Sequence, residues 1–92
     1  MTREEAGAVY NARHTYRGTG RWVNIETGET ESMRFEFFND SGITDALDEA
    51  IETVANKLDD ENIEQGETFV CIKTQDGTRS AAYKWNEKGV DG

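Results

Sequence analysis

The sequence has a single cysteine, Cys71, and a single histidine, His14, and this scarcity excludes several kinds of site. One thiol cannot form an intrachain disulfide or a cysteine-based zinc site. His14 has no serine or cysteine beside it in a nucleophile motif, and no carboxylate has the spacing of an orienting partner. We therefore expect Cys71 to be a half-buried strand residue and His14 to be solvated or at a strand edge. We predict a protein without enzymatic activity, cofactor or metal.

Long apolar runs are also missing, and hydrophobic residues make up only 35% of the 92 residues. No stretch approaches the roughly 20 apolar residues of a membrane span, and the acidic Glu4 and Glu5 do not suit a signal peptide. Two tryptophans, three tyrosines and four phenylalanines are too many for a disordered segment. We therefore expect one domain over residues 1–92 with a modest core, located in the cytoplasm.

Two short motifs lack the context that their chemistry needs. Gly18-Thr19-Gly20 has neither a strand-to-helix setting nor a Gly-Lys-Thr continuation, so it does not predict a phosphate-binding loop. The acidic run from Asp59 to Glu64 lacks the Asp-x-Asp-x-Asp-Gly order of a calcium loop. The glycines are better explained by a bulge or a close strand crossing.

The most regular pattern is an apolar stripe at helical spacing. It predicts an amphipathic helix over residues 43–60, with Asp40 or Ser41 capping its start. The stripe consists of Ile43, Ala46, Leu47, Ala50, Ile51, Val54, Ala55 and Leu58.

A strand pair follows this helix. Residues 68–74 and 79–85 are joined across Asp76-Gly77, a dipeptide that suits a two-residue type I′ turn. The resulting register pairs Thr68 with Trp85, and it predicts one side that faces the core. That side carries Val70, Ile72, Ala81, Tyr83 and Trp85.

Another strand pair, over residues 16–25 and 31–38, precedes the helix. Its second strand alternates cleanly, so Met33, Phe35 and Phe37 should face the helix. A three-residue turn with left-handed Gly28 would point Trp22 outward, and we favour this register. It places Val23 and Ile25 on the helix-facing side.

A four-residue loop is the alternative register for the same hairpin. Because a slip by one residue exchanges the two faces of a strand, this loop would turn Trp22 and Tyr16 inward. It would set Gly18 opposite Phe37 and Gly20 opposite Phe35.

The element order predicts an α+β fold, ββαββ, with a four-stranded mainly antiparallel sheet and one amphipathic helix packed on one face. Residues 1–13 fit either a short helix or a flexible arm, because Thr2-Arg3-Glu4-Glu5 has the form of a capping box. Residues 86–92 are expected to be a tail.

Negative charge is concentrated in one part of the chain. The formal net charge is −9, from 19 acidic and 10 basic residues. Between Glu36 and Glu67 there are 11 acidic residues and one lysine, a net charge of −10, whereas the remainder is nearly neutral. Such a body repels free duplex nucleic acid, so a basic protein surface is the expected partner.

The outer side of the predicted helix is the first candidate binding site. Two pairs of acidic residues, Asp45 with Asp48 and Asp48 with Glu52, are neighbours on this side. Repulsion within each pair lowers the stability of the helix by about 0.2–0.5 kcal/mol. A solvated helix or an adaptation to high salt explains this pattern with about the same weight as docking on a basic partner. The expected contact residues are Asp45, Asp48, Glu49, Glu52, Asp59, Asp60 and Glu61.

The first hairpin offers an alternative, direct nucleic-acid binding through Arg17, Arg21, Trp22 and Arg34. If Trp22, Phe38 and Phe69 face away from the helix, the open sheet presents aromatic rings among basic side chains. That composition is typical of surfaces for single-stranded nucleic acid. The same aromatics also suit a core or a dimer contact, and a phage structural or assembly protein that oligomerises through sheet edges is a further alternative.

In size, acidity and inferred topology the whole chain resembles the small inhibitors that bacteriophages encode, anti-CRISPR proteins in particular. These proteins share no common motif, so the resemblance transfers no binding residue. It implies an inhibitor in the host cytoplasm that binds a CRISPR effector or another nucleic-acid-binding complex. The acidic helix would then occupy a basic groove in place of phosphates.

Overall fold

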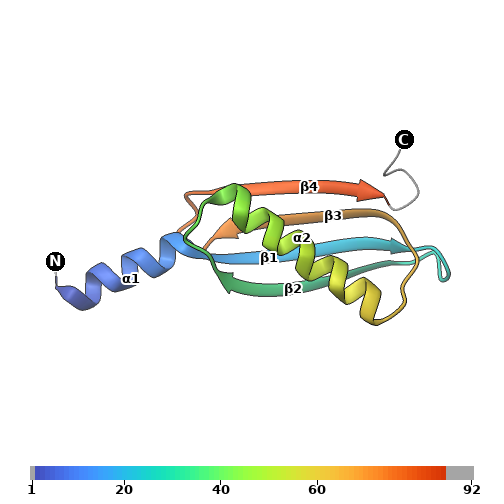
Figure 1. Ribbon diagram of the computed structural model, residues 1–92, viewed down its shortest axis with the longest axis horizontal. Coiled ribbons are helices and arrows are strands. Elements are labelled where there is room, and N and C mark those ends of the chain that lie inside the picture. Colours follow the sequence, from blue (N-terminus) through green and yellow to red (C-terminus); the bar gives the residue numbers. More distant parts are fainter. Residues whose placement is uncertain (1, 87–92) are drawn as a thin grey trace.

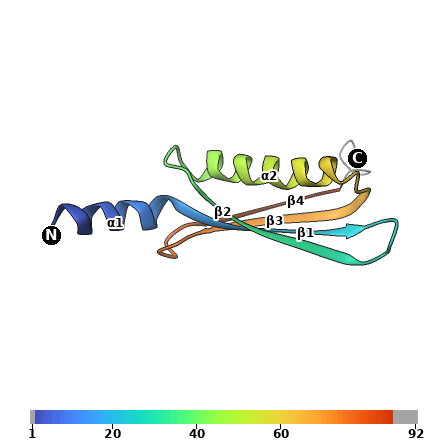
Figure 2. The ribbon, with the colours of Figure 1, turned by 90° about the horizontal axis from the view of Figure 1, so that it is seen from below.

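A computed structural model of the protein describes residues 2–86 as two helices and four strands. Its elements are α1 (Arg3–His14), β1 (Thr15–Asn24), β2 (Thr30–Phe38), α2 (Ile43–Asp60), β3 (Gln65–Thr74) and β4 (Ser80–Asn86). The strands form one antiparallel sheet in the order β2-β1-β3-β4, and α2 lies across one face of it (Figures 1 and 2). The predicted α+β class is confirmed, and α1 extends the predicted order to αββαββ.

Helix α2 has the bounds that its apolar stripe predicts. Its start differs from the expectation, because the residue before the first turn is Gly42 and no side chain caps the helix. Gly42 has φ +126°, a conformation that favours glycine. Asp40 and Ser41 therefore lie too early to cap α2. Asn39 instead orders this connection, since its Oδ1 accepts a hydrogen bond from the Ser41 N–H at 2.8 Å.

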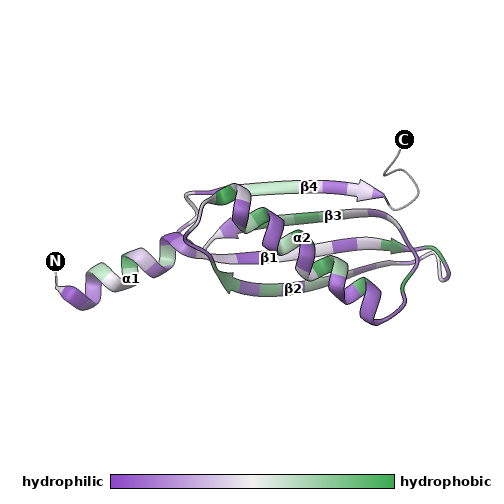
Figure 3. Cartoon of the chain, in the orientation of Figure 1, coloured by the Kyte–Doolittle hydropathy of each residue, from purple (hydrophilic) through white to green (hydrophobic). Residues whose placement is uncertain are grey.

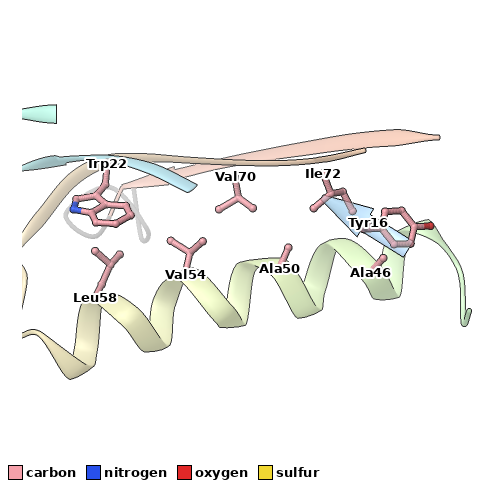
Figure 4. Packing of buried hydrophobic residues seen from close by; sticks show 8 residues of the cluster. All are labelled: Tyr16, Trp22, Ala46, Ala50, Val54, Leu58, Val70 and Ile72. Atoms are coloured by element: carbon pink, nitrogen blue, oxygen red, sulfur yellow. The ribbon is translucent and has the colours of Figure 1, made fainter. Parts of the chain in front are cut away.

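The core lies between α2 and the two central strands. Small alanines on α2 let the helix approach the sheet, where large side chains fill the space between them. Figure 4 shows Tyr16, Trp22, Val70 and Ile72 pointing from the sheet toward Ala46, Ala50, Val54 and Leu58 of α2.

The favoured register of the first hairpin is wrong. Trp22 is 3% exposed and points into the core with Tyr16, whereas Val23 and Ile25 are exposed. The two aromatic side chains bury more apolar surface than the two aliphatic ones, and this difference decides which face of β1 turns inward.

The alternative register gives the correct faces but not the observed pairs. The loop spans residues 25–28, and the Asn24 N–H donates to the Glu29 carbonyl at 2.8 Å. Gly28 is left-handed, as predicted, with φ +74°. Gly18 consequently pairs with Phe35, and Gly20 pairs with Met33.

In the second hairpin the predicted pairs are confirmed, but the turn type is wrong. Gly77 has φ +76°, whereas Asp76 is not left-handed, so a type I′ turn does not form. Asp76 instead accepts hydrogen bonds through its side chain from Thr74 and Thr78. On the expected core side, Tyr83 is exposed because β4 is an edge strand.

Residues 3–14 form a helix rather than an arm. The predicted capping box is present, since Thr2 Oγ1 accepts from the Glu5 N–H and the Glu5 carboxylate accepts from the Thr2 N–H. Helix α1 extends beyond the end of the sheet and buries none of its residues (Figure 1).

The base of α1 is held by an aromatic cluster. The rings of Tyr10 and His14 lie 4.5 Å apart, and both pack near Phe38. The Tyr10 hydroxyl donates to Asp40 at 2.7 Å. His14 is thus a half-buried residue at a helix end, not the solvated or strand-edge residue that we expected.

At the C-terminal end, Asn86 belongs to β4 rather than to the expected tail, and residues 87–92 lie outside the described residues.

Candidate interaction surfaces

Helix α2 presents six carboxylates along one side, here called the acidic face. At about 100° per residue these side chains share roughly a third of the circumference of the helix, opposite the buried Val54. They extend over about 22 Å of the helix axis. All are exposed, and hydrophilic bands recur along α2 in Figure 3. The acidic face consists of Asp45, Asp48, Glu49, Glu52, Asp59 and Asp60.

Two of these carboxylates share one amide. The Asn39 Nδ2 group donates to Asp45 at 2.8 Å and lies 3.4 Å from Glu49. Asn39 is buried at the end of β2, so its amide is fixed by its surroundings. This amide holds Asp45 and Glu49 in a defined position in the first turns of α2, where the helix dipole also favours negative charge.

The other four carboxylates of the acidic face have no side-chain partner among the described residues. Within residues 2–86, no ion pair or side-chain hydrogen bond engages Asp48, Glu52, Asp59 or Asp60. Glu61 differs, because it follows the last turn of α2 and forms an ion pair with Lys57. Six of the seven predicted contact residues therefore form one surface, and Glu61 is neutralised at its edge.

The sheet face opposite α2 is uncovered in Figure 2 and is here called the open face. It carries three of the four residues of the alternative prediction, Arg17, Arg21 and Arg34. Trp22 lies on the other side of the sheet, and its Nε1 donates to Glu31 at 2.9 Å. The prediction that Trp22 belongs to this surface is therefore wrong.

Phe38 and Phe69 face away from the helix, as the alternative prediction expected, and both are exposed. Strand alternation and pairing also place on the open face Lys73, Lys84, Glu36 and Glu67, which that prediction did not include. The alternation of each strand indicates which of its residues share a face. Which strands lie side by side, and so which residues form one surface, follows only from the pairing of β1 with β3.

The open face is predominantly basic. It carries five basic and two acidic residues, although the whole chain has 10 basic and 19 acidic ones. Both acids lie near a base, with Glu36 3.7 Å from Arg17 and Glu67 3.8 Å from Lys84. Arg21, Arg34 and Lys73 are left without a carboxylate partner among the described residues.

Two shallow hollows adjoin on the open face. The larger, of about 680 Å³, lies beside the β3–β4 loop and is lined by Arg17, Lys73 and the small side chains of Thr19, Cys71 and Ala82. Cys71 is half-buried, as expected. The smaller hollow, of about 490 Å³, shares Arg17 and Thr19 and extends to Arg34.

The two perturbed pKa values have structural explanations. Hydrogen bonds from Thr78 and Thr74 lower the pKa of Asp76 to about 2, with a smaller contribution from the charge of Arg13. The hydrogen bond to Asp40 raises the pKa of Tyr10. Both groups stabilise local structure, one in the β3–β4 loop and one at the base of α1, and neither lies within a constellation of reactive side chains.

In the described range, no three histidine, cysteine or carboxylate side chains lie close enough together to hold a metal ion. None of the helices within residues 2–86 is both long and apolar enough to cross a membrane.

Comparison with known proteins found no family model, curated protein or solved structure that matches this chain.

Proposed function

We propose that this chain is a non-catalytic interaction protein whose acidic face docks on the basic surface of a nucleic-acid-handling protein and blocks it. One observation carries this proposal. Six exposed carboxylates share one side of α2, and none of them forms an ion pair with a basic side chain of residues 2–86.

The arrangement has an energetic cost within the chain itself. Carboxylates three or four positions apart repel each other by about 0.2–0.5 kcal/mol for each pair. Lysine at one such position would replace this repulsion by a favourable pair, and Lys57 with Glu61 shows that α2 can accommodate one. A basic partner would supply the missing cations and convert the repulsion into intermolecular attraction.

Such a surface acts mainly on the rate of association. A concentrated negative field steers the chain toward a positive groove and raises the association rate, and like-charged surfaces are rejected. A rigid helix adds a fixed geometry to this field, because the carboxylates recur with almost every turn at about 5.4 Å. This arrangement suits a groove that otherwise accommodates a phosphate backbone.

The resemblance to anti-CRISPR proteins suggests a specific class of partner, an effector complex with a basic channel for guide RNA or target DNA. Occupying that channel requires no catalysis by the inhibitor. We therefore place the proposed inhibition at the binding step, in competition with nucleic acid.

The test uses three versions of the full chain. The first is the unaltered protein, and the second carries Asp48→Lys, Glu52→Lys and Asp59→Lys, which reverse three carboxylates without a partner. The third is a control with the same change in net charge, Glu4→Lys, Glu26→Lys and Glu29→Lys, outside α2. Each is used to capture proteins from a nuclease-treated lysate of the source cells.

We expect the unaltered protein and the control to enrich the same basic, nucleic-acid-handling protein and the α2 variant to lose it. Binding of that purified protein should then slow steeply with added salt and should compete with nucleic acid. Equal capture by all three versions, or equal loss in both variants, would contradict docking through the acidic face.

A further inference from the structure

The open face carries positive charge in a protein whose formal net charge is −9. Five of the nine basic residues within 2–86 lie on it, but only two of the seventeen acidic ones. The layer geometry separates this charge from the acidic face, because the full thickness of the sheet and α2 lies between them (Figure 2). A polyanion therefore has one side from which it can approach the protein.

The basic side chains surround an exposed aromatic ring in a regular way. Phe69 is 41% exposed, and its cross-strand neighbours are Arg21 on β1 and Lys84 on β4. Adjacent strands lie roughly 4.8 Å apart, so the ring has a cation on each side in one row across the sheet.

Further cations continue this pattern along the strands. Arg34 pairs with Thr19 in the next row, about 7 Å away, and Arg17 pairs with Lys73 in the row after that. Every row across the centre of the face thus carries at least one cation. The larger hollow begins at Cys71 and Ala82, one row along the strands from Phe69, and extends toward the β3–β4 loop between Arg17, Lys73 and Asp76. The small side chains of the Cys71–Ala82 row leave room for a planar group next to the row of Phe69.

We propose that the open face binds single-stranded nucleic acid. Arg17, Arg21, Arg34, Lys73 and Lys84 contact the phosphates, and one base stacks on Phe69. The neighbouring base lies over the hollow beside it. Stacking on a sheet-borne aromatic ring combined with phosphate contacts from basic side chains is a physically sufficient mode of binding a single strand.

The same features favour a single strand over the other polyanions. A duplex presents its bases already stacked on one another, so it cannot use the exposed ring of Phe69. The acidic face and its loops repel the remainder of a long rigid duplex. A second copy of the protein is also a less suitable partner for this face, because both copies carry a net charge of −9 and repel each other. This proposal concerns the layer opposite the acidic face, and it does not depend on the proposed function.

The test measures fluorescence anisotropy of a labelled oligonucleotide of roughly ten bases, as DNA and as RNA, with the full chain at several salt concentrations. We expect binding at low salt that weakens as salt rises. Phe69→Ala should weaken it by about 5- to 150-fold. Arg34→Ala should weaken it and reduce the slope of log affinity against log salt by about 0.7.

Matched variants distinguish binding at the open face from non-specific attraction of the oligonucleotide to any basic side chain. Arg3→Ala removes one exposed cation from α1, and it should change the affinity much less than Arg34→Ala. The Phe69→Trp variant preserves an aromatic ring and should retain binding. The fluorescence of the indole at position 69 should be quenched when a base stacks on it. The Asp48→Lys, Glu52→Lys, Asp59→Lys variant should retain binding, which separates this proposal from docking through the acidic face.

Three results would overturn the proposal. They are no binding at low salt, binding that is unchanged by both Phe69→Ala and Arg34→Ala, and a concentration-dependent dimer that Phe69→Ala dissociates. The last result, observed by sedimentation, would assign the open face to a second copy of the chain.

Discussion

Gly20 on β1 lies directly against Val54 of α2. A Cβ atom on residue 20 would lie 2.6 Å from Val54 Cγ2 and 3.2 Å from its Cγ1. Val54 is fully buried, so its side chain has no free space into which it can move. The absence of a side chain on Gly20 therefore sets the distance between the two layers.

We expect Gly20→Ala to lower the free energy of unfolding by about 1–3 kcal/mol, because it overpacks the layer between β1 and α2. Chemical denaturation measures this change. If the clash with Val54 is the cause, adding Gly20→Ala to a Val54→Ala background should cost clearly less than adding it to the unaltered protein.

Gly18→Ala is the matched control on the same strand. Its Cβ would meet the ring of Phe35, with the nearest atom at 2.3 Å. This ring is only partly buried on the edge strand β2, so it can move aside. We expect a smaller cost than at Gly20, and an equal or larger cost would contradict this explanation.

Helix α2 and strand β1 show which features of the fold can be predicted from the sequence and which cannot. The stripe on α2 identifies its bounds and its buried side because 3.6-residue periodicity is a local property. The alternation of β1 reveals two faces but not which of them is inward, since Tyr16, Gly20 and Trp22 on one face compete with aliphatic residues on the other for contact with a helix more than thirty residues away. Trp22 was consequently assigned to the wrong surface.

The two candidate surfaces differ in the same way, because one depends on local spacing and the other on the pairing of distant strands. The acidic face could be predicted almost completely, because residues on one helix share a side by their spacing alone. The open face could be predicted only in part, since Arg21 becomes a neighbour of Phe69 only when β1 pairs with β3. The arginines of the first hairpin indicated one half of this surface, but not the strand that lies beside it.

Trp22 tests this correction directly. Because its indole is buried and donates to Glu31, Trp22→Phe should lower the free energy of unfolding by about 1–3 kcal/mol. Trp22→Ala should cost about 3–5 kcal/mol through the cavity that it leaves. Thermal or chemical unfolding measures both changes. Oligonucleotide affinity of the folded Trp22→Phe variant should remain unchanged, and a loss comparable to that of Phe69→Ala would place Trp22 on the binding surface after all.

Asp76 makes the stability of the β3–β4 loop dependent on pH. Its pKa is lowered from 3.8 to about 2 by hydrogen bonds from Thr78 and Thr74, so its ionised form stabilises the folded state. This contribution is fully present above its usual pKa and is lost as pH falls through the folded-state value. We expect Asp76→Asn to be less stable than the unaltered protein at neutral pH.

The difference between the two proteins should shrink as pH falls from about 4 to about 2. Melting temperatures measured in parallel over this range test it, because the other carboxylates titrate in both proteins and cancel in the comparison. A difference that stays constant down to the lowest pH would mean that the charge of Asp76 plays no part in closing the loop.

On the acidic face, Asp48→Asn should raise the free energy of unfolding by about 0.2–0.5 kcal/mol for each of the pairs that Asp48 forms with Asp45 and Glu52. Added salt should stabilise the unaltered protein and reduce this gain, because exposed charges are screened over a Debye length of about 10 Å or less. Glu29→Gln makes the same change in net charge in the β1–β2 loop, and it should give a smaller gain. Equal gains in the two variants would attribute the effect to net charge, whereas a loss in Asp48→Asn would show that this carboxylate stabilises the fold. The expected result would show that the carboxylates of the acidic face lower the free energy of unfolding of the protein. A role in binding a basic partner would explain why they are there despite this cost.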